Sequence, residues 1–158
     1  MFFVASKPSR NGTAVRLTVY TDYSLRMLMY LAVKGDGLPT IAEVADAYGI
    51  SKAHLTKVAH QLGLLGYVET VRGKGGGLRL ARAAERISLG EVVRRTEPDL
   101  ALAPCFEPVH VPCPIVPACG LRGALYEARQ AFLVVLDRYS LADLVRRRAE
   151  LDALLHVT

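Results

Sequence analysis

The sequence lacks the signatures of a membrane protein and of a secreted protein. No uncharged apolar run approaches the roughly 18 to 20 residues that a helix needs to cross a bilayer. The first five residues have no basic segment and too short an apolar stretch for a signal peptide. We therefore expect a cytoplasmic protein with no membrane partner.

The sequence also lacks the motifs of the common enzyme classes. No Gly-x-Ser-x-Gly, His-Glu-x-x-His or paired-carboxylate arrangement appears, and the four histidines are scattered along the chain. The glycine-rich residues 72–77 do not match a phosphate-binding loop, because Lys74 is followed by Gly75 rather than by Ser or Thr. These absences argue against an enzyme and against a nucleotide site.

Cysteine is scarce, and its few copies are clustered. The three cysteines lie between residues 105 and 119; their odd number and the lack of a secretory segment argue against a disulfide framework. Residues 98–117 carry six of the eight prolines, so this segment should be irregular and stiff. Buried structural cysteines rarely crowd into such a segment. The pattern predicts a metal site with the ligands Cys105, Cys113 and Cys119.

Positive charge is also absent from the sequence around these thiols. No Lys or Arg occurs between Arg95 and Arg122, whereas Glu97, Asp99 and Glu107 do. We therefore expect neutral or acidic groups around the thiols, with a cationic metal as their natural partner.

Two kinds of metal centre fit the cysteine spacing. Structural zinc with His110 as a fourth ligand is one, because zinc sites of three cysteines and one histidine are common. The gaps of seven and five residues between the cysteines do not resemble close zinc pairs, whereas iron-sulfur clusters accept wider and more varied spacings. The spacing favours an iron-sulfur cluster and leaves zinc as the alternative.

A helix-turn-helix is the clearest fold signal in the sequence. A first helix is expected from Asp22 to about Lys34, capped by Thr21 or Asp22. A second is expected over residues 41–48 with Thr40 as cap and Glu43 at its third position. The inward face of the first helix is predicted to be Leu25, Leu28, Met29 and Ala32.

A third helix and a hairpin complete this unit. The third helix is expected from about Lys52 to Leu65, with Ser51 as cap, Gly66 as stop, and Leu55, Val58, Ala59 and Leu62 turned inward. Residues 67–71 and 78–80 read as two strands joined by the glycine-rich turn. The fold class is therefore mainly α, a winged helix-turn-helix with a small β-hairpin wing.

The basic charge of the chain is concentrated in this unit. Residues 51–86 hold seven Lys or Arg against two acids and so supply the whole net charge of +5. A solvated basic surface is one interpretation, but the coincidence with a helix-turn-helix and wing favours double-stranded DNA. The predicted contacts are Lys52, His54, Thr56 and Lys57 in the major groove, and Arg72 and Lys74 of the wing on the backbone or minor groove.

A long helix is expected after the cysteines. Its apolar residues follow spacings of 4, 3, 4, 3 and 4, which predicts a heptad seam and a homodimer, with packing against its own domain as the alternative. The seam consists of Leu121, Leu125, Ala128, Phe132, Val135 and Tyr139. A short amphipathic helix over residues 140–155, capped by Ser140, should follow.

These elements divide the chain into five parts. Residues 1–14 are an extension expected to be disordered, and residues 15–96 are the winged helix-turn-helix domain. Residues 97–119 are the cluster-binding loop, residues 120–145 the dimerisation helix and the following short helix, and residues 146–158 a C-terminal tail.

Three stretches, together with the three loop cysteines, resemble the winged-helix iron-sulfur transcriptional repressors. They are Arg16-Leu17-Thr18 followed by Thr21-Asp22-Tyr23 and Leu25-Arg26, the glycine-rich residues 72–77, and Ala131-Phe132 followed by Tyr139-Ser140-Leu141-Ala142-Asp143-Leu144. The resemblance covers roughly residues 15–145 and is strongest to the nitrite-sensitive repressors, which respond to nitric oxide. It implies a homodimer on a palindromic operator, with one iron-sulfur cluster per subunit, [2Fe-2S] or [4Fe-4S], whose state controls DNA affinity.

The resemblance also bears on the fourth ligand. In the nitrite-sensitive members an Asp at the start of the first helix, supplied by the other subunit, is a ligand, and the matching residue here is Asp22. Helix capping, or an ion pair with Arg26, is its alternative role. Members that regulate cluster biogenesis use a His three residues after the third cysteine, where this chain has Arg122, which cannot serve as a ligand. Regulation of cluster biogenesis or iron homeostasis, and a zinc-stabilised factor without redox sensing, stay as alternatives.

Overall fold

The computed structural model describes residues 16–106 and 113–156, so the extension expected to be disordered, residues 1–14, lies outside the described part. Within that part the fold is mainly helical with one two-stranded antiparallel sheet, as predicted. None of its helices is both long and apolar enough to span a bilayer. The main elements are α1 (Val19–Lys34), α2 (Ile41–Tyr48), α3 (Lys52–Leu64), β1 (Val68–Val71), β2 (Gly77–Leu80), α4 (Leu89–Thr96), α5 (Gly120–Asp137), α6 (Leu141–Leu144) and α7 (Arg148–Leu155).

Helix α1 begins one turn earlier than predicted. Thr18 has an extended backbone, and its side chain accepts a hydrogen bond from the Thr21 amide at 3.2 Å, so Thr18 is the N-cap. The predicted caps, Thr21 and Asp22, are therefore wrong, and Asp22 lies in the first turn. The inward face is rotated as well, since only Leu28 of the four expected residues is buried and the other three pack at its edge. The buried side chains of α1 are Thr21, Ser24, Met27, Leu28, Tyr30, Leu31 and Val33.

The helix-turn-helix follows its predicted signals closely. Thr40 and Glu43 form the expected reciprocal capping box at the start of α2, and Gly49 ends this helix in a left-handed conformation. The four predicted inward residues of α3 are all buried. Ser51 occupies the predicted N-cap position of α3, but its side chain makes no cap hydrogen bond there.

The wing is fixed to the connection between α1 and α2. Strand β2 pairs with β1 on one side, and on the other the amide of Leu78 donates to the carbonyl of Pro39 at 2.8 Å. A Cβ at Gly77 would lie 2.1 Å from the carbonyl oxygen of Leu38, so only glycine permits this approach. The base of the wing is thus held against the helical body, and the sequence-predicted winged helix is confirmed.

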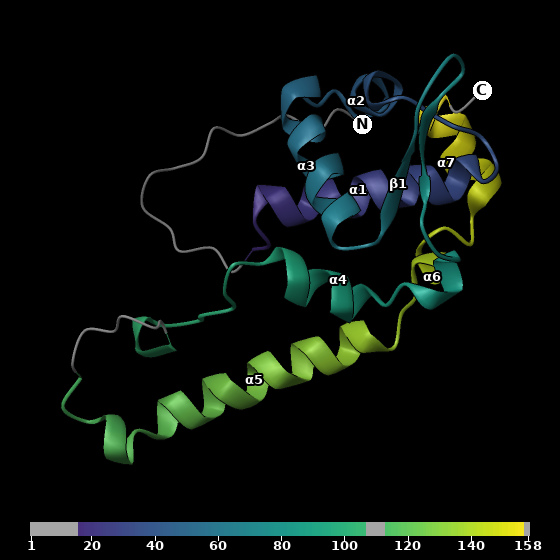
Figure 1. Cartoon of the computed structure of the whole chain (residues 1–158). Helices are drawn as coiled ribbons and strands as arrows, with labels where there is room; N and C mark the ends of the chain where they lie inside the picture. Colours follow the sequence, from purple (N-terminus) through teal and green to yellow (C-terminus); the bar gives the residue numbers. More distant parts are fainter. Residues whose placement is uncertain (1–15, 107–112, 157–158) are drawn as a thin grey trace.

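Helix α4 packs against α1 on one side and against α5 on the other (Figure 1). Ser88 caps α4, and the backbone joins the start of α4 to the end of α5, where the Leu89 amide donates to the Tyr139 carbonyl at 2.9 Å. The opposite end of α5, with Cys119 as its N-cap, projects beyond the body of the molecule (Figure 1). The cysteine segment is therefore carried at the projecting end of α5, whereas α4 stays packed against α1.

The C-terminal part contains two helices rather than the single one expected over residues 140–155. Ser140 caps α6 with a reciprocal hydrogen bond from Asp143, as predicted. At Val145 the backbone leaves the helical region, with φ −112° and ψ 22°, and α7 begins three residues later. Helix α7 packs against α1 on the side away from α4 (Figure 1).

Candidate metal centre and nucleic-acid interface

The start of α3 presents its polar residues to solvent. Lys52, His54, Thr56 and Lys57 are all exposed, whereas Leu55 between them is buried. The Thr56 hydroxyl donates to the Lys52 carbonyl at 2.8 Å, which leaves its oxygen free to accept. The His54 ring lies 6.3 Å from the ring of Tyr23 on α1, a contact that orients it beside the helix. The arrangement suits insertion of this end of α3 into a major groove.

The turn of the wing brings two further cations to the surface. Arg72 and Lys74 are exposed in a tight turn in which Gly73 and Gly75 have positive φ angles of 100° and 77°. No Cβ contact lies within 4 Å at either glycine, so the turn stands free of the body.

The neighbouring cations on the hairpin have other partners. Arg79 forms an ion pair with Glu69 across the two strands at 2.8 Å. Arg82 lies over the buried ring of Tyr67 at 4.7 Å and donates to the Gly66 carbonyl at 3.3 Å. Arg79 and Arg82 are therefore engaged within the protein, and fewer cations are available to DNA than the seven counted in residues 51–86.

The three cysteines are free thiols that differ in exposure. Cys113 is exposed, while Cys105 and Cys119 are half-buried. In the described residues around them, the chain forms two short 3-10 turns, at Pro104–Phe106 and Val116–Ala118, in agreement with the irregular segment predicted. His110, the ligand considered for zinc, lies outside the described residues.

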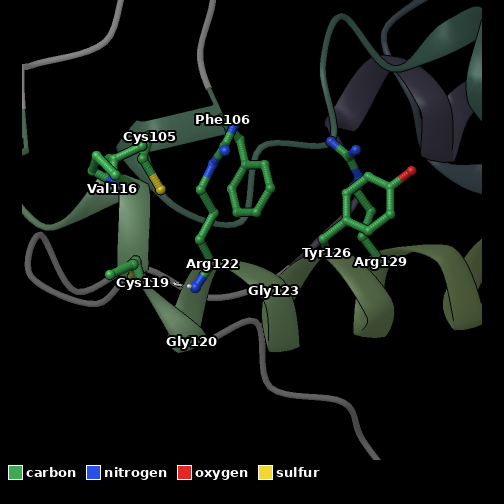
Figure 2. Close-up of a pocket in the computed structure, with 11 residues that line it drawn as sticks. Cys105, Phe106, Val116, Cys119, Gly120, Arg122, Gly123, Tyr126 and Arg129 are labelled. Atoms are coloured by element: carbon green, nitrogen blue, oxygen red, sulfur yellow. Dashed lines mark hydrogen bonds between the residues drawn. The ribbon is translucent and has the colours of Figure 1, made fainter.

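Cys105 and Cys119 line one hollow between the cysteine segment and the first turns of α5. The hollow has a volume of about 930 Å³ and is closed on the segment side by Val116, Pro117 and Ala118. Figure 2 shows the two cysteines at one end of it, with Phe106 and Arg122 between them and Arg129. Cys113 does not belong to its lining, so the structure brings two of the three predicted ligands together.

The surroundings of these thiols are cationic, which corrects the expectation of neutral or acidic groups. Arg122 and Arg129 both line the hollow, and their guanidinium groups lie 5.8 and 5.2 Å from the centre of the Phe106 ring. Arg129 also lies 5.3 Å from the ring of Tyr126. The expectation fails because α5 folds back along the segment and turns its own arginines toward it, although none occurs within the segment itself.

Cys119 has a second role as the N-cap of α5. Its Sγ accepts a hydrogen bond from the Arg122 amide at 3.4 Å (Figure 2). The partial positive charge at the start of an 18-residue helix favours negative charge on this sulfur. Sulfur donors beside guanidinium groups and a helix N-terminus suit a thiolate-bound iron-sulfur cluster, because such a centre concentrates negative charge. The donor set therefore fits the group that the spacing favoured.

Asp22 is placed apart from the cysteines of its own chain. On α1 its carboxylate pairs with Arg26 at 2.9 Å, in the i,i+4 geometry considered as its alternative role. Arg26 in turn lies 5.7 Å from the ring of Tyr48 on α2, where burial raises the pKa of the Tyr48 hydroxyl to about 12. The Asp22 side chain is 46% exposed, so it is open to a partner molecule. Among the residues that the structure describes, no three His, Cys, Asp or Glu side chains come together in a metal-binding group.

The aromatic and cationic part of the hollow was missed in the sequence. Arg122, Tyr126 and Arg129 are spaced i, i+4 and i+7 and so share one face of α5, a pattern readable once the helix start is known. Phe106 carries no such signal, because its contact with that face depends on how the cysteine segment turns.

Helix α5 leaves its predicted seam uncovered. Leu133 is the only buried residue among its 18, and it lies outside the seam. Leu121, Phe132, Val135 and Tyr139 are 67%, 44%, 45% and 47% exposed, Ala128 is also exposed, and Leu125 is half-buried. The seam therefore does not pack against the domain of its own chain, which was the alternative prediction. Leu133, outside the seam, is the residue of α5 that is buried.

A winged helix-turn-helix with an attached long helix and a cysteine segment defines a DNA-binding transcriptional regulator. The family model for Rrf2, described as an iron-dependent transcriptional regulator, matches residues 17–147, and the chain belongs to this family.

Individual relatives agree with this assignment. The chain is 51% identical over 142 residues to the HTH-type transcriptional regulator NsrR of Bacillus subtilis, covering 89% of this chain and 97% of the relative. It is 50% identical over 142 residues to NsrR of Shouchella clausii, covering 89% and 95%. The solved structure of CymR, the global cysteine regulator of B. subtilis, matches with a TM-score of 0.69 at 27% identity, covering 85% and 98%.

Proposed function

We propose that the chain is a homodimeric repressor whose Cys105, Cys113 and Cys119 hold one iron-sulfur cluster per subunit, [2Fe-2S] or [4Fe-4S]. We further propose that nitric oxide is its effector and releases it from DNA. The observation that carries this proposal is the shared hollow, in which two of the three thiols lie beside two arginines and a helix N-terminus. The similarity to regulators named NsrR supports the effector.

The fourth ligand is Asp22 of the opposite subunit in this proposal. Its carboxylate is open on the surface of α1 and exchanges its contact with Arg26 for the bond to the metal centre. When bound, the cluster supplies iron, for which nitric oxide is a strong ligand. Three thiolates and one carboxylate make an unequal ligand set, because soft thiolates suit iron-sulfur centres better than a hard carboxylate. Asp22 is therefore the ligand that this chain gives up first.

The consequence of losing Asp22 follows from its place on α1. Helix α1 packs against α3, so a bond from Asp22 to the other subunit fixes where α3 lies relative to that subunit. A dimer reads two half-sites about one helical turn apart, and both copies of α3 must fit at once. Release of Asp22 removes this restraint, and the population of DNA-competent dimers falls.

The dimer itself is assigned to the seam of α5. Its exposed apolar side chains lie on one face over most of the helix length. A second copy of the same face buries them in knobs-into-holes packing. The two winged helices are then carried on one rigid axis and bind a palindromic operator in double-stranded DNA.

Anaerobic purification followed by metal analysis tests the proposal. We expect a brown protein with iron and acid-labile sulfide, and colourless folded dimers for Cys105→Ala, Cys113→Ala and Cys119→Ala. An Arg147→Ala variant, altered at an exposed side chain just before α7, is the control and should keep its colour. A colourless wild-type protein that contains zinc would instead support a zinc-stabilised factor without redox sensing.

A further inference from the structure

A pair of hydrogen bonds joins the start of the cysteine segment to the start of α1. Glu97 Oε1 accepts from the Thr18 amide at 2.7 Å and from the Thr18 hydroxyl at 3.1 Å. Glu97 directly follows α4, and its own amide donates to the Val93 carbonyl at 2.9 Å. Since Thr18 is the N-cap of α1, the carboxylate also lies where the helix favours negative charge.

A buried layer lies behind this contact. The Thr21 hydroxyl donates to Thr96 Oγ1 at 3.0 Å, and the Thr96 hydroxyl donates to the Val92 carbonyl at 2.8 Å. Thr21 and Thr96 are 0% and 5% exposed, so breaking these bonds without water is costly. The end of α4 and the first turn of α1 therefore form one polar joint between two helices that are far apart in sequence.

The proposed ligands Cys105 and Asp22 both lie close in sequence to this joint. Glu97 precedes Cys105 by eight residues, and Thr18 precedes Asp22 by four residues on the same helix turn. Helix α1 also packs against the recognition helix α3. A displacement of the cysteine segment consequently reaches Glu97 before any other contact with the DNA-binding domain along the chain from Cys105.

We propose that Glu97 is a positioning residue of the switch: its bonds to Thr18 pass the state of the cysteine segment to α1, and through α1 to α3. This proposal rests on the proposed function, because it assumes that the segment changes when its metal centre does. The route lies within one subunit and adds to the route through Asp22 of the partner. The latch is the set of two Glu97–Thr18 hydrogen bonds.

The test compares operator affinity of the cluster-loaded and metal-free proteins. Glu97→Ala removes the latch, and Glu97→Asp keeps the charge but is one methylene too short to reach Thr18. In both variants we expect the ratio of loaded to metal-free affinity to fall by about fivefold or more, the lower range of allosteric coupling. Glu97→Gln keeps an acceptor oxygen and should retain most of the ratio. Glu150→Ala, which removes an exposed carboxylate on α7, is the matched control and should not change it.

A second readout does not need the metal. Amide hydrogen exchange of the metal-free protein should show faster exchange at Thr18, by about tenfold, in Glu97→Ala but not in Glu150→Ala. Unchanged exchange at Thr18 would overturn the latch. In Glu97→Ala and Glu97→Asp, the loaded and metal-free proteins could instead lose operator affinity equally, so that their ratio stays at the wild-type value. That result would also overturn the latch and leave Glu97 with a structural role. A wild-type ratio of one would overturn the proposed function, and the latch with it.

Discussion

Arg94 and Asp137 join the DNA-binding domain to the long helix through two parallel hydrogen bonds of 2.5 and 2.6 Å. The pairing raises the pKa of Arg94 and lowers the pKa of Asp137, because each charged group is stabilised by hydrogen bonds to the other. Gly90 makes room for it, since a Cβ there would lie 2.0 Å from Asp137 Oδ1. This ion pair therefore helps to fix the angle between α4 and α5.

The first prediction concerns that angle. In Arg94→Gln or Asp137→Asn we expect a loss of preference for one operator half-site spacing, because α5 can then tilt against the winged helix. Overall stability should fall only slightly, because exposed ion pairs contribute little to it. Binding to operators with one-base-pair insertions measures the effect. Arg147→Gln is the control and should keep the preference. The reversed pair, Arg94→Asp with Asp137→Arg, should restore it. An unchanged preference for half-site spacing in the single variants would contradict the prediction.

The second prediction concerns the seam of α5. Val135 and Val134 are neighbours with similar exposure, 45% and 51%, but only Val135 belongs to the seam. We expect Val135→Asp to give monomers, because a carboxylate buried between two helices without a partner is strongly unfavourable. Val134→Asp should stay dimeric. Sedimentation equilibrium distinguishes the two, and dimers of equal strength in both variants would remove the seam from the interface.

The third prediction concerns DNA contacts. Lys57→Ala and Lys74→Ala should each weaken operator binding and reduce the slope of log affinity against log salt by about 1, because one fewer counterion is released. Arg147→Ala, just before α7, should leave the slope unchanged. Fluorescence anisotropy between low and moderate salt provides the measurement. A wild-type slope in either lysine variant would exclude that lysine from the interface.

The fourth prediction concerns acid stability of the helix-turn-helix. The pKa of Glu43 is lowered, chiefly by its hydrogen bond from the Thr40 amide and next by that with the Thr40 side chain. The stabilisation is therefore complete above the unfolded pKa of about 4.3 and is lost as the pH falls through the lower folded value. Glu43→Gln should lower the free energy of unfolding at pH 7, and the difference from wild type should shrink at an acidic pH below the unfolded pKa. Urea denaturation at the two pH values checks this, and a difference independent of pH would contradict it.

Local signals in the sequence were sufficient for much of the DNA-binding domain. The Thr40–Glu43 capping box and the wing depend on residues close in sequence, and each was predicted correctly. The start of α1 was missed because Thr18, Thr21 and Asp22 are all capable caps. The choice of Thr18 is reinforced by Glu97, which is 79 residues away.

The candidate metal site was predictable only in part, for a similar reason. Spacing and prolines located the three cysteines in one irregular segment, but not which two share a hollow. Arg129 and Phe106 meet there because α5 runs back along the segment, and no local pattern encodes this. The sign of the charge around the thiols depends on that return, so the sequence alone indicated the wrong sign.

Anaerobic titration of the operator-bound, cluster-loaded dimer with nitric oxide tests the central claim most directly. Visible absorbance reports the metal centre, and fluorescence anisotropy of a labelled operator reports DNA occupancy in the same sample. The account predicts that DNA is released as the absorbance changes, at amounts of nitric oxide comparable to the cluster, and that Cys105→Ala shows no response. Operator affinity that stays the same before and after complete reaction of the cluster would contradict it.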